Sequence, residues 1–190
     1  IMGKFIHLHT HSHYSLLSAF PKIPELVKAA KNNKMGALAL TDNGNLYGAI
    51  EFYKECKDNG VKPIIGVDFY IAARTRHDKE HALDNNRTRL VLLAKDYTGY
   101  QNLVKLVTLS NLEGFFNRPR LDHELIQKHK DGLICILPSF NSEISASIRI
   151  SNQTEAEKKL GWYKSVFGEN LYLELTHHSD IENHEELMEN

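Results

Sequence analysis

Short apolar runs alternate with helix-like stretches along most of this chain of 190 residues. Residues 37–41, 63–71 and 90–94 are dominated by aliphatic side chains, which is typical of buried strands. Residues 24–34 and 47–57 separate these runs, and their apolar side chains recur at the spacing of one helical face. The pattern therefore predicts strands joined by helices.

The same alternation continues to the end of the chain. Residues 100–112 predict a helix, and Thr154 and Glu157 form the capping-box pattern of a helix that ends near Phe167. Residues 73–88 are polar without periodicity, which predicts a loop or an irregular hairpin. The other predicted elements are strands at 4–9, 133–137 and 171–175, a helix at 122–130 that Asp122 caps, a short helix at 142–150, and a helix from 181 onward.

About six strands that alternate with helices predict an α/β fold with a mostly parallel sheet. The strands are short and end in polar residues, which fits a (β/α) barrel with its site at the carboxyl ends of the strands. A full barrel needs about 200 to 250 residues. We therefore expect the last unit to be missing, and the chain to be cut from a longer protein. Ile1 precedes Met2 and is expected to be a vector remnant.

Composition excludes several functional classes. The formal net charge is −1, so no global basic field is available to hold nucleic acid. Cys56 and Cys135 match no CxxC metal or redox pattern, and Cys135 lies in an apolar run. Few cysteines and no signal peptide predict a cytoplasmic protein. No apolar run approaches the length of a membrane span.

Three histidines near the start point to metal chemistry. His7, His9 and His11 occupy alternate positions, so a strand would direct all three side chains to one face. Neutral imidazoles that converge in this way suit zinc or manganese. The chain holds 11 histidines, so some clustering is also expected by chance.

Polar residues follow two further predicted strands. Asp42 and Asn43 come directly after residues 37–41, and Asp68 lies in or just before the end of the next strand. Taken alone, Asp42 could be a turn residue before Gly44, and Asp68 could point outward from an edge strand. Because all of these residues would meet His9 and His11 at one rim, together they favour a metal site.

Several motifs then give the chain a family resemblance. Residues 5–12 (FIHLHTHS), 37–49 (ALALTDNGNLYGA), 62–66 (KPIIG) and 90–95 (LVLLAK) resemble the PHP (polymerase and histidinol phosphatase) domain of bacterial DNA polymerase III alpha subunits. The match continues in order to residues 171–175 (LYLEL), so we assign residues 1–190 to one PHP domain. The resemblance implies a distorted (β/α)7 barrel, here truncated before its last unit. In metal-competent members the rim holds up to three ions and supports phosphoester hydrolysis, in some cases 3′–5′ proofreading.

The resemblance carries four metal ligands over to this chain. His9 and His11 match the His-x-His pair of the family, and Asp42 matches the Asp of its Thr-Asp-His-Gly motif. Asp68 stands where the family has a Glu, so its carboxylate reaches less far by one methylene. The last Asp-x-His pair of the family would lie beyond Asn190.

Four other positions depart from the family pattern. Ser18 replaces an Asp, Asn43 replaces a His, and Ser139 aligns less securely with a Cys or His. Arg89 stands where a His precedes the Val-Leu-Leu-Ala strand. Serine and asparagine are weak partners for zinc, and a guanidinium stays protonated. We expect Arg89 to exclude an ion and to pair with Asp68 or Asp42 as an internal cation; the alternative is that it points to solvent.

Three functions follow from the resemblance. The first is a non-catalytic domain that braces the palm and thumb of a polymerase, with docking of a proofreading exonuclease as a further implied role and contact with DNA only through the full polymerase. The second is a metal-dependent phosphoesterase or 3′–5′ exonuclease that uses His9, His11, Asp42 and Asp68. The third is a free-standing phosphatase of the histidinol phosphate type, against which the polymerase-like motifs argue. We favour the first, with no cofactor or one weakly bound zinc or manganese ion at His9 and His11, and we assign no catalytic residue.

Overall fold

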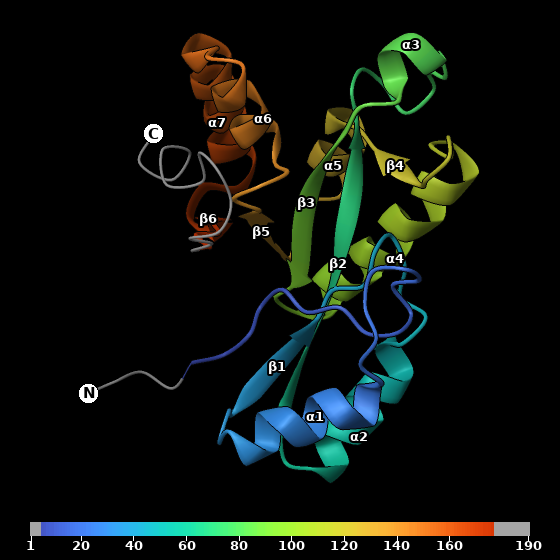
Figure 1. Cartoon of the computed structure of the whole chain (residues 1–190), viewed down its shortest axis with the longest axis vertical. Helices are drawn as coiled ribbons and strands as arrows, with labels where there is room; N and C mark the ends of the chain where they lie inside the picture. Colours follow the sequence, from blue (N-terminus) through green and yellow to red (C-terminus); the bar gives the residue numbers. More distant parts are fainter. Residues whose placement is uncertain (1–4, 177–190) are drawn as a thin grey trace.

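A computed structural model describes residues 5–176 and places helices around a central sheet (Figure 1). The elements in chain order are α1 (Ile23–Asn32), β1 (Ala37–Leu40), α2 (Ala49–Asp58), β2 (Lys62–Ala72), α3 (His81–Asp84), β3 (Arg87–Ala94), α4 (Tyr97–Leu112), β4 (Arg120–Leu121), α5 (His123–Lys128), β5 (Leu133–Leu137), α6 (Glu143–Arg149), α7 (Gln153–Phe167), the 3-10 helix η1 (Gly168–Asn170) and β6 (Leu171–Leu173). The predicted α/β class is confirmed.

One strand runs against the rest of the sheet. The strand order is β1-β2-β3-β5-β6, and β4 pairs with β2. β2 pairs in parallel with β1 and β4, and β5 with β6, whereas β3 is antiparallel to both β2 and β5. Over the described residues the sheet is therefore mixed, and it does not close into a barrel.

The reversal of β3 has a local cause. A parallel return needs a crossover that is usually a helix of the sheet's length. Residues 73–86 contain only the four-residue helix α3, whose axis spans about 6 Å. The chain therefore turns back as an irregular hairpin, one of the two alternatives predicted for residues 73–88. Arg89, at the start of β3, consequently lies beside Tyr70 near the end of β2.

Successive side chains of β2 and β3 point to opposite faces of the sheet, so the main core and the candidate site lie on different faces. Leu90 and Leu92 pack in the main core, beneath α4, α5 and α7. Val91 and Leu93 lie on the opposite face of β3 in a smaller cluster. Asp68 pairs with Val91 in the sheet, so its side chain belongs to that second face. A separate cluster joins α1 and α2 to β1, with Ile23, Phe52 and Cys56 fully buried.

The predicted strand at residues 4–9 is wrong for the residues that the structure describes. From Phe5 the chain is irregular, and it contacts β1 and the residue after it through two backbone hydrogen bonds. The Ala39 N–H donates to the His7 carbonyl at 3.0 Å, and the Thr41 N–H donates to the Thr10 carbonyl at 2.8 Å. Phe5 is 67% exposed, so the apolar start of this segment has no core face to bury.

Other differences concern the ends of elements. The capping-box prediction is wrong, because the N-cap of α7 is Asn152, two residues before Thr154, and the Asn152 side chain accepts from the Glu155 N–H. β4 and α3 were not predicted, since two- and four-residue elements leave no periodic signal. Asp122 does cap α5, as expected. The helix predicted from residue 181 lies outside the described residues.

None of the helices in residues 5–176 has the length and apolar character needed to cross a bilayer. Cys56 and Cys135 are both free and buried.

Candidate metal centre

Two imidazoles converge on one buried carboxylate. His9 Nε2 lies 3.1 Å from Asp68 Oδ2, and His11 Nε2 lies 3.2 Å from the same oxygen. The Asp68 side chain is 3% exposed. Potential ligand atoms of these three residues all lie within 4.8 Å of one another, and no other His, Cys, Asp or Glu between residues 5 and 176 joins the group.

The backbone on both sides of Asp68 is fixed by the loop after β1. The Asp68 N–H donates to the Asp42 carbonyl at 3.1 Å, and the Gly44 N–H donates to the Asp68 carbonyl at 2.9 Å. Gly44 has φ +62°, a conformation that a residue without Cβ adopts at little cost. This turn therefore holds Asn43 beside Asp68, where the two residues form an isolated bridge.

Arg89 occupies the remaining side of the carboxylate. Its Nε donates to Asp68 Oδ1 at 2.9 Å, and its Nη2 donates to Asp68 Oδ2 and to Asn43 Oδ1. The guanidinium also lies 4.3 Å from the centroid of the Tyr70 ring, within cation–π range. Arg89 thus points into the site and pairs with Asp68, one of the two partners expected from the sequence, rather than facing solvent.

The charges in this cluster stabilise one another. Burial alone would raise the pKa of Asp68, but hydrogen bonds from His11, His9 and Arg89 hold that pKa well below its usual range. Burial would likewise lower the pKa of His9, yet Asp68 and Glu174 raise it to about 9. Asp68 raises the pKa of Arg89 against the opposing effect of burial. The pKa shifts of His9 and Arg89 therefore favour their charged forms beside an ionised Asp68 carboxylate.

Glu174 is a member of the site that sequence reasoning missed. Its Oε2 and Oε1 atoms lie 3.0 and 3.2 Å from His9 Nδ1, so His9 bridges two carboxylates. The residue follows β6, and its N–H donates to the Leu137 carbonyl at 2.9 Å. The predicted strand at residues 171–175 placed Glu174 inside it, whereas β6 ends at Leu173 and leaves Glu174 at the carboxyl end of a strand, the kind of position that selected Asp42.

Asp42 lies outside the histidine group and has other partners. Its carboxylate accepts from the Ser12 N–H at 2.7 Å, the Ser12 hydroxyl at 2.8 Å and the Ser15 hydroxyl at 2.6 Å. It is 2% exposed. These contacts fasten the loop that follows the histidine segment to the end of β1, which accounts for the burial of the charge.

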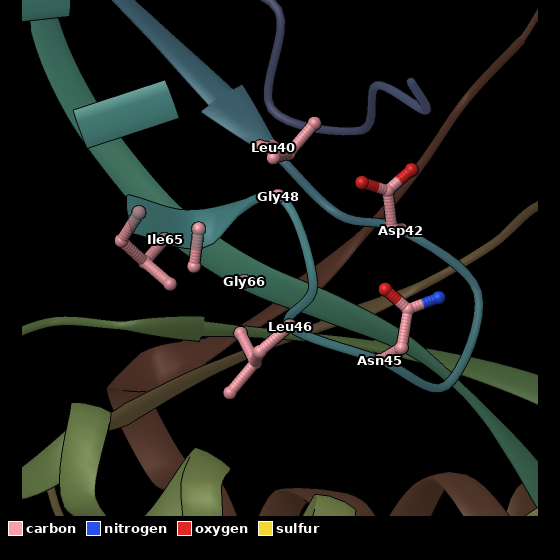
Figure 2. Close-up of a pocket in the computed structure, with 8 residues that line it drawn as sticks. Leu40, Asp42, Asn45, Leu46, Gly48, Ile65 and Gly66 are labelled. Carbon is pink, nitrogen blue, oxygen red and sulfur yellow. The ribbon is translucent and has the colours of Figure 1, made fainter. Parts of the chain in front are cut away.

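A small hollow beside Asp42 is mostly apolar. Figure 2 shows Asp42 and Asn45 at one end of it, with the aliphatic side chains of Leu40, Leu46 and Ile65 at the other. The hollow leaves no room for a water molecule. It is a packing feature and offers no space for a substrate.

The remaining predicted positions do not join the cluster. His7 is exposed and its ring meets Phe5 edge to face at 4.7 Å. Ser18 is exposed, and its N–H donates to the Ser15 carbonyl within a turn. The Ser139 hydroxyl lies 2.6 Å from that of Thr176. Of the four replaced positions, the structure thus brings only Asn43 and Arg89 to the carboxylate.

The residues fit a catalytic metal cluster poorly. His9, His11 and Asp68 offer three donors, but the Asp68 oxygen that both imidazoles face also accepts from Arg89. A dication about 5 Å from a fixed guanidinium is opposed by roughly 6–7 kcal/mol at an effective dielectric constant near 20. An ion could use the three donors only if Arg89 moved away.

Comparison with known families identifies similar proteins. The family model described as the PHP domain matches residues 7–178. DNA polymerase III subunit alpha of Borreliella burgdorferi is 45% identical over 177 residues, which cover 93% of this chain and 15% of that protein. The Thermus aquaticus subunit is 44% identical over 179 residues, with 92% and 15% covered. The chain therefore spans about 15% of the length of these curated relatives.

A solved structure shares the fold. It is a protein from Bifidobacterium adolescentis described as a candidate metal-dependent phosphoesterase, with a TM-score of 0.58 and 10% identity. The alignment covers 96% of this chain and 81% of that one. At this level of identity the likeness concerns the fold alone.

Proposed function

The chain belongs to the PHP domain family, and we propose that it serves as the PHP domain of a bacterial DNA polymerase III alpha subunit in which an internal salt-bridge network has replaced the metal centre. In this role the domain is a structural part of the polymerase. The polymerase activity of such a subunit lies in the rest of the protein, which this chain does not cover.

A single observation carries the proposal: Arg89 donates to both carboxylate oxygens of Asp68 and to Asn43. In the family pattern, positions 43 and 89 hold histidine ligands. Here an amide and a guanidinium stand there and contact each other. A guanidinium can link two acceptors as an ion would, but it cannot lower the pKa of a bound water. The network preserves the architecture of the rim without the means for hydrolysis.

The relatives support a role for the domain within a larger polymerase subunit. Subunits from Borreliella, Thermus and Chlamydia match over 92–94% of this chain. We propose that the domain braces the palm and thumb of such a subunit, offers a docking site to a proofreading exonuclease, and meets DNA only through the full polymerase. As part of a bacterial replication protein, it would act in the cytoplasm.

Metal analysis of the full-length subunit tests the proposal. The protein is purified without chelator and its zinc and manganese are measured by mass spectrometry, for the wild type and for the double variant Asn43→His, Arg89→His. We expect far less than one ion per wild-type chain and a gain in the double variant, which restores two imidazoles. Arg118→His is the matched control, since it makes the same chemical change at an exposed position. Near-stoichiometric metal in the wild type would contradict the proposal.

The cluster of His9, His11 and Asp68 favours a second candidate, a metal-dependent phosphoesterase or 3′–5′ exonuclease. In that case one weakly held zinc or manganese ion would occupy these three donors, with Arg89 displaced. The test is release of mononucleotides from a DNA 3′ end by the full-length subunit with added zinc or manganese. Activity that is lost in His9→Ala and retained in His7→Ala would establish this function, because His7 lies outside the cluster.

A further inference from the structure

A cluster of polar and aromatic side chains joins three helices outside the candidate metal centre. His123 Nε2 lies 2.8 Å from Glu143 Oε2, and the Tyr163 hydroxyl donates to the same oxygen. The His123 ring also stacks on the Trp162 ring, with centroids 3.8 Å apart and planes 15° from parallel. His123 begins α5, Glu143 begins α6, and the two aromatic residues belong to α7. We call these four residues the helix latch.

The helix latch combines a buried carboxylate with a histidine that solvent reaches. The Glu143 side chain is 12% exposed, whereas the His123 side chain is 40% exposed. Burial alone would raise the pKa of Glu143, but His123, Tyr163 and Lys159 hold that pKa below its usual range. The carboxylate is therefore ionised near neutral pH, and the imidazole can exchange protons with water.

The other groups around this pair keep one charge state near neutral pH. Burial raises the pKa of Tyr163 and that of Cys135, which faces Tyr163 from β5, so both stay protonated. Lys159 contributes a positive charge from α7 and donates to Ser147 Oγ on α6 at 3.1 Å. Histidine is the residue type whose charge ordinarily changes between pH 5 and 8. In the described part of the chain, His123 is therefore the group that can change the charge of the helix latch in this range.

Protonation of His123 would strengthen both of its contacts. An imidazolium donates to a carboxylate about twice as strongly as a neutral donor does, and the face of an indole ring attracts a cation. The contacts of His123 with Glu143 and Trp162 therefore hold α5 on α6 and α7 most firmly on the acid side of neutrality. Because the pKa of Glu143 is lower in the folded chain, the carboxylate makes its full contribution above about pH 4 and loses it only in stronger acid.

The helix latch lies two residues from a backbone contact of the candidate metal centre. The Arg89 N–H donates to the Asn141 carbonyl at 2.7 Å. Ser142 follows Asn141 and caps α6 by accepting from the Ser145 N–H, and Glu143 is the first residue of that helix. Figure 1 shows α6 packed beside α7, which holds the other half of the latch. A shift of the first turn of α6 would therefore move the carbonyl that holds the start of β3.

We propose that the helix latch is a pH-sensitive switch: protonated His123 fixes the first turn of α6 and, through Asn141, the backbone of Arg89. When His123 loses its proton, the first turn of α6 loosens and the hydrogen bond from the Arg89 N–H weakens with it. The inference rests on the proposed function, in which Arg89 takes the place of a metal ion, and it adds a means by which that residue is regulated.

Hydrogen exchange of the full-length subunit at pH 6 and pH 8, corrected for the intrinsic effect of pH, tests the switch. We expect protection of α6 and of the Arg89 amide to fall about fivefold from pH 6 to pH 8, as a charge-assisted hydrogen bond becomes a neutral one. His123→Gln keeps a donor without a charge, and its protection should be the same at both pH values. His129→Gln makes the same change at the other end of α5 and should keep the wild-type response.

Equal protection of the wild type at both pH values, or an unchanged pH response in His123→Gln, would overturn the inference. A response in α6 that leaves the Arg89 amide unaffected would also overturn it, because the switch would not reach the site. Glu143→Gln removes the carboxylate instead and should abolish the response as well; retained DNA synthesis shows that each variant is folded. Metal content is measured on the same samples. Bound metal would reject the proposed loss of the metal centre, whereas a missing pH response in metal-free protein would reject only the switch.

Discussion

Arg89 and Asp68 form a two-point contact, with Nε donating to Oδ1 at 2.9 Å and Nη2 donating to Oδ2. The two residues meet because β3 runs against its neighbours and brings its first residues beside the last residues of β2. A fixed cation therefore lies beside the carboxylate that both histidines face.

Removal of the guanidinium should destabilise the domain. In Arg89→Ala, the 3% exposed Asp68 carboxylate loses its two-point partner and keeps the two imidazoles. Breaking a buried ion pair from one side costs about 3–5 kcal/mol, and the retained histidines place this variant near the lower limit. Urea unfolding measures the change, with Arg118→Ala as the exposed control. A loss below about 0.5 kcal/mol, the range of ordinary surface substitutions, would show that the pair has no structural role.

Asp42→Asn should affect stability and leave metal content unchanged. The carboxylate accepts three hydrogen bonds from Ser12 and Ser15, and an amide would turn an N–H group towards at least one donor. Hydrogen bonds to a charged group contribute about 1.5–3 kcal/mol each, so a net loss of roughly 2–4 kcal/mol is expected. Thermal or urea unfolding measures it. If the variant were as stable as the wild type but bound less metal, Asp42 would be a ligand.

Arg120 should be needed for the shape of the β2–β3 connection. It is fully buried and donates to the carbonyls of Gly114, Arg76 and Asp78 at 2.8–3.2 Å. Arg120→Met keeps most of the apolar volume but leaves these carbonyls without a donor, at a cost of about 3–5 kcal/mol. Hydrogen exchange should also rise in residues 73–86. An unchanged exchange pattern would contradict this role.

The contribution of the β2–β3 connection to stability should depend on pH in the acid range. A hydrogen bond from Arg74 lowers the pKa of Asp84 to about 2, against an ordinary value near 3.9 in the unfolded chain. Because the folded pKa is the lower one, this contribution to stability is complete above about pH 4 and is lost as the pH falls through 2. Urea midpoints between pH 2 and 5 should therefore fall more steeply in the wild type than in Asp84→Asn. Parallel curves would refute the assignment.

Sequence patterns predicted the fold class well because apolar alternation reports burial directly. The runs around Leu40 and Val67 became β1 and β2 to within one residue at each end, whereas β3 begins at Arg87, three residues before the predicted start at Leu90. The first segment failed because its apolar residues Phe5 and Leu8 are exposed, so apolar character alone did not imply a buried strand.

The site was predictable in part. Family alignment placed His9, His11, Asp68 and Arg89 together, and the structure brings all four into contact. The family resemblance could not show that Asp42 lies outside the histidine group, because a carboxylate that accepts from serine hydroxyls has the same sequence signal as a metal ligand. The antiparallel direction of β3 could not be predicted from the sequence either, because it depends on how residues 73–86 fold around Arg120.

In the function that we propose, Arg89 takes the place of a metal ion. Crystals of the unaltered protein soaked in zinc or manganese, with anomalous diffraction recorded on both sides of the metal absorption edge, test it most directly. We expect no anomalous peak among His9, His11 and Asp68, with the guanidinium of Arg89 on the carboxylate. Two or more ions among these side chains, with Arg89 turned outward, would contradict it.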